Sequence, residues 1–280
     1  MDKKLVDLFI KNAIAEDVGD GDHTSRSTIP SGTQGKAKLI VKEDGILAGV
    51  ELAVAIFNHV DPALKVNVLL QDGETIKIGD IVLTVEGSTH AILLSERLVL
   101  NCMQRMSGIA TKTHHIVSLL KPYHTQVLDT RKTTPGLRYL EKWAVKIGGG
   151  VNHRIGLYDM ILIKDNHVDY AGGISNAIVA ANNYLQKTQK NLAIEIEVRN
   201  LTELKEVLDQ GNVDRVMLDN FDLPLLKEAV KLVDGRLITE ASGGITAENV
   251  AAYAACGVDY ISMGALTHSV KSLDLSLKAY

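Results

Sequence analysis

The sequence contains little cysteine, little proline and few aromatic residues. It has 2 cysteines and 5 prolines among 280 residues, and aromatic side chains make up 4% of the chain. Cys102 and Cys256 lie in helix-like apolar contexts without the spacing of metal ligands, which argues against a disulfide scaffold and a cysteine metal site. We expect both thiols to be reduced core residues, as in a cytoplasmic protein.

The sequence also lacks a basic excess and a long apolar run. Its formal net charge is -4, which argues against a general nucleic-acid surface but leaves room for a local basic pocket that binds phosphates. No apolar run approaches the length of a membrane span. Residues 1–20 have the pattern of an amphipathic helix and lack the apolar stretch of a secretory signal. We therefore predict a cytoplasmic chain without membrane or nucleic-acid partners.

The first part of the sequence mixes helix and strand patterns irregularly. Short strand-like runs follow the N-terminal helical pattern, and Asp44-Gly45 between two of them indicates a β-hairpin. A second turn at Gly79-Asp80 separates later strand-like runs. Apolar residues at helical spacing then predict one long helix over 91–120. These patterns are typical of a small domain that combines helices and strands.

From residue 127 onward, strand-like apolar runs alternate regularly with helix-like segments. Nearly continuous apolar strands separated by amphipathic helices indicate a parallel sheet with helices outside it. The six strand-like runs are VLDT, YDMILIKD, LAIEIEV, DRVMLDN, RLITEAS and VDYISMGAL. This number is too small for a full closed barrel of this type. The fold class that we predict is therefore α/β, with an open, incomplete parallel α/β barrel.

Charged and polar residues stand at the carboxyl ends of these runs. In a parallel barrel those ends converge on one mouth, so we expect the residues to line a shared pocket. The strand-end residues are Asp129-Thr130-Arg131-Lys132, Lys164-Asp165-Asn166, Glu197, Asp219-Asn220, Glu240-Ala241-Ser242-Gly243-Gly244 and Met263-Gly264-Ala265.

Several of these residues also have a purely structural interpretation. We interpret Asp165 and Asn220 as caps of the helices that follow them. Glu195 and Glu197 are two residues apart, so they face the same side of one strand, and one of them is expected to pair with a lysine inside the barrel. Lys164 could be that ion-paired lysine, or a lysine whose stem covers apolar surface.

The segment Ser242–Val250 predicts an anion site. Consecutive glycines, Gly243 and Gly244, allow backbone N–H groups to converge on a phosphate, and the helix predicted in TAENV would add its positive N-terminal end. Gly264 ends the next strand in a similar way. Phosphate sites in α/β barrels lie after the last two strands, which is where these features fall. The alternative is two glycine turns without a ligand.

The predicted pocket combines cations, carboxylates and an anion site. Arginine and lysine suit a substrate that carries carboxylates, whereas Glu197 and Asp219 suit sugar hydroxyls or a hydrated Mg²⁺ ion. This combination indicates a phosphorylated sugar that meets a polyanionic acid. Two alternatives stay open: an aldolase in which Lys164 forms a Schiff base, and a carrier or binding module built around the Gly79-Asp80 turn.

Motifs spread along nearly the whole chain resemble those of the quinolinate phosphoribosyltransferase family, and they occur in the family's order. The matching segments are EDVGDGDHTS (16–25), SERLVLNCMQRMSGIAT (95–111), DTRKTTPGLRYLEKWAVKIGGGVNHRIGLYDMILIKDNH (129–167), IEIEV (194–198), LDN (218–220), EASGGI (240–245) and VDYISMGALTHS (258–269). Related proteins of transport operons share this likeness and stay open as an alternative.

The resemblance implies an N-terminal α/β sandwich over residues 1–110, joined by the returning segment 269–280, and an open α/β barrel over 111–268. It implies transfer of phosphoribosyl from 5-phosphoribosyl-1-pyrophosphate to quinolinate with decarboxylation, which gives nicotinate mononucleotide, pyrophosphate and CO₂ in NAD biosynthesis. Mg²⁺ is the implied cofactor, held by Glu197 and Asp219 directly or through water. A homodimer, or a higher oligomer that contains it, is the implied assembly.

The resemblance also implies a role for each matching residue. Quinolinate would be bound by Arg131, His153, Arg154 and Lys164, together with Arg97 of the second subunit. Lys132 would meet the pyrophosphate, and Glu197 and Asp219 would hold the ribose hydroxyls. The 5-phosphate would be surrounded by Ser242, Gly243, Gly244, Gly264 and His268, with Thr130, Met263 and Ala265 as further lining residues. Lys132, Lys164, Glu197 and Asp219 are the implied catalytic residues.

Overall fold

The computed structural model describes residues 3–280, which form two compact units. The first unit contains the described residues through His114, together with Thr134–Gly149 and Ser269–Tyr280. The second unit contains His115–Thr133 and Gly150–His268. The predicted barrel domain also included residues 134–149. They lie in the first unit because Glu141 of this segment accepts two hydrogen bonds from Arg105 there.

The first unit is built on an antiparallel sheet of four strands in the order β12-β1-β5-β3. Its elements are α1 (Lys3–Val18), α2 (His23–Thr28), β1 (Gln34–Val41), β2 (Gly45–Ile46), α3 (Val50–Val60), β3 (Lys65–Val68), β4 (Thr75–Ile76), β5 (Ile81–Ser88), α4 (Thr89–Leu120, whose last six residues belong to the second unit), α5 (Arg138–Ile147) and β12 (Leu275–Ala279). Ala37, Leu39 and Val41 of β1 are buried while the residues between them are more exposed, as expected for a strand covered on one face.

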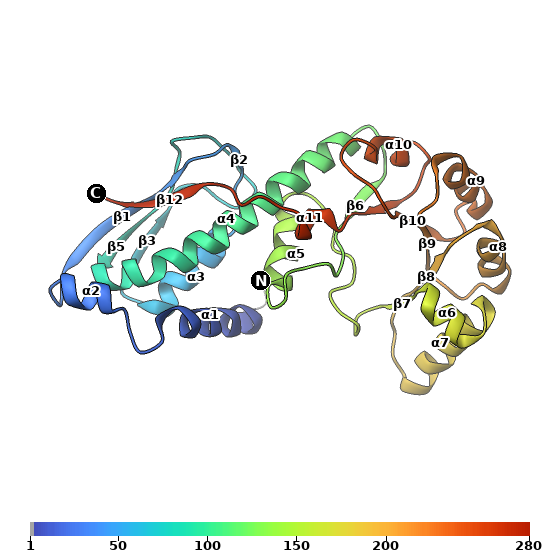
Figure 1. Ribbon diagram of the computed structural model, residues 1–280, viewed down its shortest axis with the longest axis horizontal. Coiled ribbons are helices and arrows are strands. Elements are labelled where there is room, and N and C mark those ends of the chain that lie inside the picture. The colour runs from blue at the N-terminus through green and yellow to red at the C-terminus, as the bar shows by residue number, and fades with distance from the viewer. Residues whose placement is uncertain (1–2) are drawn as a thin grey trace. The chain divides into compact units, whose positions relative to one another are not determined.

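Two observations connect distant parts of the chain within this unit. β12 pairs with β1, so the last described segment returns to the first unit. The long helix predicted over 91–120 is present as α4, and the Gln104 side chain of α4 donates a hydrogen bond to the Leu275 carbonyl of β12 over 2.9 Å. Figure 1 shows α4 running along this sheet.

The predicted hairpin at Asp44-Gly45 is wrong. β1 pairs with β12 and β5, whereas β2 pairs with β4 to form a separate two-stranded sheet. The physical reason lies in Asp44, whose Oδ1 accepts a hydrogen bond from the Ile78 N–H over 2.8 Å. Asp44 therefore supports a neighbouring turn far along the chain instead of closing a local one.

The second unit is an open barrel in which all six predicted strands are present. They form one parallel sheet in the order β6-β11-β10-β9-β8-β7. The elements are β6 (Gln126–Leu128), β7 (Ile161–Ile163), α6 (Asp165–Ala171), α7 (Ile174–Thr188), β8 (Ile194–Val198), α8 (Leu201–Gln210), β9 (Arg215–Asp219), α9 (Leu223–Val233), β10 (Ile238–Ser242), α10 (Val250–Ala254), β11 (Tyr260–Ser262) and α11 (Ala265–His268). Helices α8, α9 and α10 lie outside the curved row of strands (Figure 1).

The sheet stays open because β6 and β7 are its two edges. Val151 forms an isolated parallel bridge with Leu128 of β6, so the segment that follows runs beside that edge. The strand register aligns the polar strand ends, since Asp219 lies opposite Ser242. Across residues 3–280, no helix is long and apolar enough to cross a bilayer.

Candidate active site

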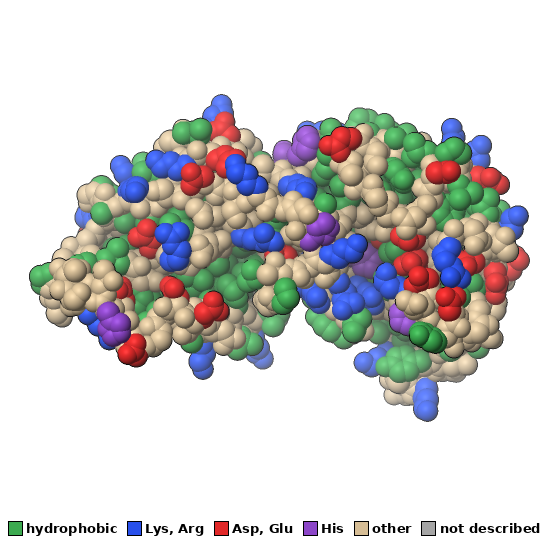
Figure 2. Space-filling model, in the orientation of Figure 1, with side chains coloured by type: hydrophobic (Ala, Val, Ile, Leu, Met, Phe, Trp, Pro, Cys, Tyr) green, Lys and Arg blue, Asp and Glu red, His purple; other side chains and the backbone are tan. Residues whose placement is uncertain are grey.

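A cavity of about 810 Å³ lies at the carboxyl ends of the barrel strands. Of the strand-end residues expected there, Asp129, Asp165, Asn166 and Ala241 do not line it, since Asp129 and Ala241 are fully buried and Asp165 and Asn166 begin α6. Every barrel residue to which the family resemblance gives a role lines the cavity, and the strand register explains why residues so far apart in sequence meet there. These residues are Thr130, Arg131, Lys132, His153, Arg154, Lys164, Glu197, Asp219, Ser242, Gly243, Gly244, Met263, Gly264, Ala265 and His268. On the face in view in Figure 2, basic and acidic side chains of the barrel unit gather next to each other.

Arg131 and Arg154 create a strongly positive region in the cavity. The pKa of Arg154 is lowered by burial and then by the charge of Arg131, which shows that the two guanidinium groups repel each other. The Arg154 Nη1 atom also donates to the Met160 carbonyl over 3.3 Å. Two cations held together in this way favour a ligand with more than one negative charge.

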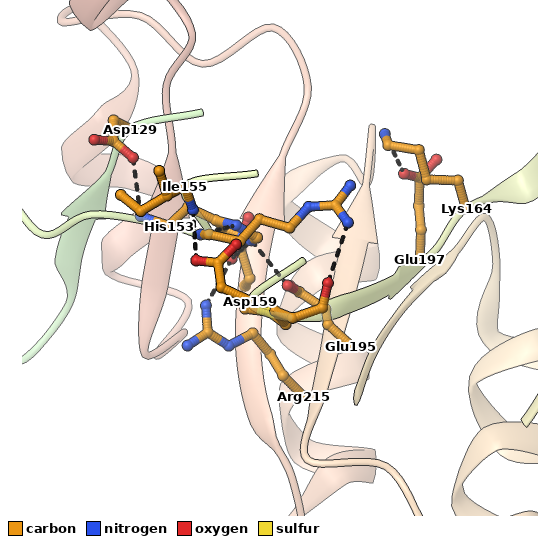
Figure 3. A network of polar contacts seen from close by, with 11 residues as sticks. Asp129, His153, Ile155, Asp159, Lys164, Glu195, Glu197 and Arg215 are labelled. Atoms are coloured by element: carbon orange, nitrogen blue, oxygen red, sulfur yellow. Dashed lines mark hydrogen bonds and ion pairs between the residues drawn. The ribbon is translucent and has the colours of Figure 1, made fainter. Parts of the chain in front are cut away.

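Lys164 and Glu197 form an ion pair inside the cavity, with 3.1 Å between Nζ and Oε2 (Figure 3). The Glu197 side chain is 9% exposed and that of Lys164 is 48% exposed. Burial raises the pKa of Glu197, and the hydrogen bond from Lys164 opposes that shift. Lys164 is therefore the lysine that pairs with a strand carboxylate, and its charge is held at the end of β7.

His153 lines the cavity and is held by several polar contacts (Figure 3). Its backbone N–H donates to Asp129 Oδ1 over 2.9 Å, and its Nδ1 accepts the Arg154 N–H over 2.7 Å. Its Nε2 lies 2.8 Å from Glu195 Oε2 and 3.4 Å from Glu240 Oε2. Both ring nitrogens are thus engaged within the chain, so His153 lines the cavity without offering a ring N–H to a ligand in this arrangement.

The pKa of the buried His153 ring depends on the carboxylates of Glu195 and Glu240. Burial lowers the pKa of His153, but hydrogen bonds to Glu195 and Glu240 outweigh it and raise the pKa to about 9. The Arg154 N–H that points at Nδ1 opposes this shift, because it favours the neutral ring. Burial and then the charge of Glu240 raise the pKa of Glu195. Arg215 contacts Glu240 over 3.2 Å, which compensates part of the buried negative charge.

Asp219 ends β9 and is held by its neighbour Asn220. The Asn220 Nδ2 atom donates to Asp219 Oδ2 over 2.6 Å. The prediction that Asn220 caps the next helix is wrong, because α9 begins at Leu223 and Asp222 is its N-cap, accepting the Leu225 N–H over 2.9 Å. Asp165 is likewise the first residue of α6 and not its N-cap, which is Lys164.

The turn predicted to bind an anion contains Gly243 and Gly244, whose φ angles are +95° and +61°. These left-handed conformations are accessible to glycine without strain, and successive N–H groups in such a turn can face an anion. The helix that follows does not contribute its N-terminal end to this turn as predicted. α10 begins only at Val250 and spans 5 residues, and the Thr246 N–H already donates to Asn249 Oδ1.

Lys132 and His268 approach the backbone of Gly264 from two sides. A Cβ atom at Gly264 would lie 2.8 Å from the Lys132 Cδ atom and 3.1 Å from the His268 Cδ2 atom. The Thr267 hydroxyl of α11 donates to the Lys132 carbonyl over 2.8 Å, which ties the loop after β6 to the end of β11. A side chain at position 264 would have to push the Lys132 and His268 side chains aside, so glycine leaves room for both cavity residues.

Arg97 does not line the barrel cavity. It lies on α4 in the first unit, where it is exposed and lines a different cavity of about 530 Å³ together with Asn101 and Arg105. Within residues 3–280, its guanidinium group makes no hydrogen bond and no ion pair. An exposed, unpaired arginine on a cavity wall is accessible to a ligand or to another chain.

Glu197 and Asp219 are better suited to hold a magnesium ion than the buried cluster of His153, Glu195 and Glu240. Mg²⁺ prefers oxygen ligands and is usually held by one or two carboxylates together with substrate phosphates, which matches Glu197 and Asp219. Among the described residues, His153, Glu195 and Glu240 form the one cluster with ligand atoms close enough to hold an ion by themselves. One of the three ligands in that cluster is a histidine nitrogen, whereas Mg²⁺ prefers oxygen ligands.

The structure adds cavity and floor residues that the sequence prediction missed. Met217 and Ser262 line the cavity, and Arg215 lies beneath it in contact with Glu240. The signal for the two lining residues was the period of two along each strand, because Met217 precedes Asp219 by two residues and Ser262 precedes Gly264 by two residues, so each faces the same side as a predicted residue. The sequence alone could not indicate Arg215, because its place opposite Glu195 follows from the strand register, which a single sequence does not contain.

Comparison with known proteins identifies the family that the chain resembles in sequence. Two family models match it: the quinolinate phosphoribosyl transferase N-terminal domain over residues 22–107 and the C-terminal domain over residues 109–278. A chloroplastic nicotinate-nucleotide pyrophosphorylase (carboxylating) of Arabidopsis thaliana is 49% identical over 284 residues, which cover 96% of this chain and 81% of that protein.

Further relatives extend the similarity to bacteria and to a solved structure. A probable nicotinate-nucleotide pyrophosphorylase (carboxylating) of Bacillus subtilis is 42% identical over 98% of this chain and 92% of its own length. The crystal structure of NadC from Streptococcus pyogenes aligns with a TM-score of 0.93 and 38% identity, covering 99% of this chain and 97% of that one. The predicted fold class is thereby confirmed.

Proposed function

The chain belongs to the quinolinate phosphoribosyltransferase family, and we propose that the barrel cavity is where its two substrates react. The enzyme transfers phosphoribosyl to quinolinate with decarboxylation, in de novo NAD biosynthesis. The observation that carries the proposed site is the meeting of three features in one cavity: adjacent arginines, strand-end carboxylates and a glycine turn in the left-handed conformation.

The cationic side of the cavity binds quinolinate in this proposal. Arg131 and Arg154 take the two ring carboxylates, since paired guanidinium groups suit a dianion and arginine forks bind carboxylates bidentately. Lys164 adds a third cation from the end of β7. His153 acts by holding the Arg154 backbone and by forming the cavity wall, because its nitrogens already have partners.

The opposite side binds 5-phosphoribosyl-1-pyrophosphate. Gly243 and Gly244, with Ser242, Gly264 and His268, surround the 5-phosphate, while Glu197 and Asp219 face the ribose hydroxyls. Lys132 lies beside Gly264 and meets the pyrophosphate. The remaining lining residues Thr130, Met263 and Ala265 complete this wall.

We propose Mg²⁺ as the cofactor, which Glu197 and Asp219 would hold directly or through water. When bound, it would supply positive charge for the leaving pyrophosphate. Glu197 suits this role because its oxygens are largely buried and point into the cavity beside Lys164.

The chain's own residues account for both parts of the reaction. As the bond to pyrophosphate breaks, positive charge develops on the ribose, and the fixed carboxylates of Glu197 and Asp219 stabilise it. Once the pyridine nitrogen carries the ribose, its positive charge accommodates the electron pair left on the ring carbon when CO₂ departs. A proton from solvent completes the product. Arg131 and Arg154 need only hold the ring in place, so no covalent nucleophile is required.

A homodimer that shares Arg97 between subunits is the assembly that we propose, alone or within a higher oligomer. Arg97 is exposed, lacks a partner in the described chain and belongs to the first unit, whereas the barrel cavity belongs to the second. A second copy could therefore supply it to a quinolinate carboxylate.

We propose a cytoplasmic location and no nucleic-acid partner. Cys102 and Cys256 are both free, but only Cys102 is the buried core residue that was predicted, because Cys256 is partly exposed. Burial raises the pKa of the Cys102 thiol to about 12. The net charge of -4 gives the surface no general attraction for nucleic acids. The names of plant relatives place those proteins in chloroplasts or mitochondria, so the compartment is a property to test for this chain.

The two other functions considered from the sequence are not supported. The Lys164 Nζ atom is held by Glu197 Oε2 over 3.1 Å, whereas a Schiff-base aldolase needs a lysine nitrogen that is free to attack a carbonyl carbon. A carrier role for the Gly79-Asp80 turn leaves the cavity unexplained, and the family membership assigns the chain to enzymes.

The proposed site is tested with quinolinate labelled in the 2-carboxylate. Labelled CO₂ is expected only when phosphoribosyl pyrophosphate is present, together with an equal amount of pyrophosphate. Lys164→Ala should abolish this release, whereas Lys187→Ala, which removes an exposed lysine of α7, should retain it. Wild-type release by Lys164→Ala, or CO₂ release without the second substrate, would contradict the proposed site.

A further inference from the structure

Asn220 lies between the two parts of the cavity that the proposed function assigns to phosphoribosyl pyrophosphate. It follows Asp219 at the end of β9, and its backbone N–H donates to the Ser242 carbonyl of β10 over 2.8 Å. Its φ angle of +56° lies in the left-handed region, which few residues other than glycine and asparagine adopt readily.

The Asn220 side chain acts on Asp219 directly. Its Nδ2 donates to Asp219 Oδ2 over 2.6 Å, so one carboxylate oxygen is bound within the chain and the rotation of the carboxylate is restricted. The other oxygen, Oδ1, keeps its lone pairs for a ligand. A glycine at this position would keep the backbone conformation and lose this restraint.

The same side chain also presses against the glycine turn. A Cβ atom at Gly243 would overlap the Asn220 Oδ1 atom and would lie 2.9 Å from the Asn220 backbone nitrogen. The Asn220 amide therefore packs directly over Gly243. Asp219, Asn220 and Gly243 all line the cavity, so one side chain contacts both the carboxylate and the anion site.

From this geometry we infer that Asn220 is a positioning residue for the phosphoribosyl donor. Its amide sets the orientation of Asp219 relative to the Gly243–Gly244 turn. Asp219 can then contact the ribose while the turn binds the 5-phosphate of the same substrate molecule. This inference rests on the proposed function of the cavity. The inference assigns to Asn220 an effect on donor binding and none on quinolinate binding, because Arg131 and Arg154 lie between β6 and β7 and not in the turns after β9 and β10.

The competing explanation is that Asn220 only occupies a left-handed turn, and the chain contains a matched control for it. Asn212 has a φ angle of +57°, is exposed and lies before the start of β9, at the opposite end of the strand. Asn212→Gly therefore reports the effect of replacing a left-handed asparagine on stability alone.

The experiment compares Asn220→Gly, Asn220→Asp and Asn212→Gly by calorimetric titration. Each purified variant is titrated with phosphoribosyl pyrophosphate and, separately, with quinolinate, in the presence and absence of Mg²⁺, and its stability is measured by urea denaturation. Asp219→Asn serves as the reference for loss of the carboxylate that Asn220 positions. None of these titrations depends on turnover.

We expect Asn220→Gly to weaken donor binding by about three- to tenfold, the effect of one lost hydrogen bond, and to leave quinolinate binding unchanged. Asn220→Asp keeps the size of the side chain and the preference for the turn, but it places a second carboxylate against Asp219. Its loss of donor affinity should therefore exceed that of Asn220→Gly by about tenfold. Both Asn→Gly variants should change stability by similar amounts.

Donor affinity like that of the wild type in Asn220→Gly would overturn the inference, and so would an equal loss for donor and quinolinate. If Asp219→Asn weakens donor binding in that same experiment, the site assignment survives and only the role of Asn220 fails. If Asp219→Asn also binds the donor normally, the proposed function of this wall fails as well.

Discussion

Arg131 at the barrel mouth is a single residue whose role in quinolinate binding can be tested by substitution. Arg131→Ala should weaken quinolinate binding by about 2–5 kcal/mol, because a buried carboxylate would lose its charged partner. Equilibrium titration with quinolinate measures this effect directly. The fold should be retained, since Arg131 lies in a loop after β6 and outside the regular elements.

The matched control is Arg236→Ala. Arg236 is exposed and lies just before β10, at the amino ends of the strands, where it donates to the Val233 and Leu232 carbonyls. Its removal should leave quinolinate affinity unchanged. Equal affinities in Arg131→Ala and the wild type would remove Arg131 from the site.

The strand-end carboxylates should affect turnover more than stability. Glu197→Gln and Asp219→Asn each remove a charge that we assign to the ribose and to Mg²⁺, so kcat should fall by about tenfold or more at every Mg²⁺ concentration. Steady-state rates across a Mg²⁺ series, with urea denaturation of the same samples, make this comparison.

Glu228→Gln provides the control for loss of a carboxylate, because Glu228 is an exposed residue of α9. It should match the wild type in both measurements. A variant Asp219→Asn with near-normal turnover throughout the Mg²⁺ series would show that Asp219 does not carry this role.

At the scale of single residues, the sequence predicted cavity residues and a pair between a strand glutamate and a lysine, but it did not predict the partner of Asp219. The strand-end rule led to Arg131, Lys164 and Glu197 because those positions follow from chain order and period alone. The hydrogen bond from Asn220 to Asp219 depends on a left-handed backbone at Asn220. A single sequence does not distinguish that conformation from a helix cap, since asparagine favours both.

At the scale of elements, the turn after β10 should be specific for the phosphoribosyl donor. Gly243→Val should weaken phosphoribosyl pyrophosphate much more than quinolinate, because the new side chain would overlap the Asn220 amide and close the backbone to a phosphate. Titration with each substrate separately measures the difference.

Gly235→Val separates this effect from backbone strain. Gly235 has a φ angle of +70° and open space around its Cβ position, so valine there incurs only the conformational cost of about 1–2 kcal/mol. It should lower stability without changing either affinity. Equal damage to both substrates by Gly243→Val would indicate misfolding instead of a lost phosphate site.

The elements also show where local patterns are sufficient. All six barrel strands and the long α4 helix were predictable, because their apolar periodicity extends over many residues. The hairpin at Asp44-Gly45 was not, because the pairing of β1 with β12 and β5 depends on distant partners. The short α10 helix begins later than its sequence suggested, since Asn249 engages the preceding turn.

At the scale of the whole molecule, the decisive question is whether two chains build one site. Arg97→Ala and Lys164→Ala should each be nearly inactive alone. When they are unfolded and refolded together in equal amounts, about half of the dimers are mixed, and a site shared in trans restores about a quarter of normal sites. Activity of the refolded mixture, compared with that of each variant refolded alone, measures this recovery.

Mixing Lys187→Ala with Lys164→Ala in the same way controls for refolding yield, because the first of these should retain full activity. If Arg97 acted within its own chain, every site in a mixed dimer would carry one defect. The mixture of Arg97→Ala and Lys164→Ala would then stay at the background of the separate variants.

The pairing of β12 with β1 has a consequence for the order of synthesis. β1 is made early, yet its neighbour Leu275–Ala279 is added after the whole barrel has been translated. During elongation one edge of β1 therefore stays open, and such edges invite pairing with other chains. The barrel can complete its six-stranded sheet before the first unit completes its own sheet. A nascent chain stalled after residue 268 should therefore recruit chaperones through the exposed backbone of β1.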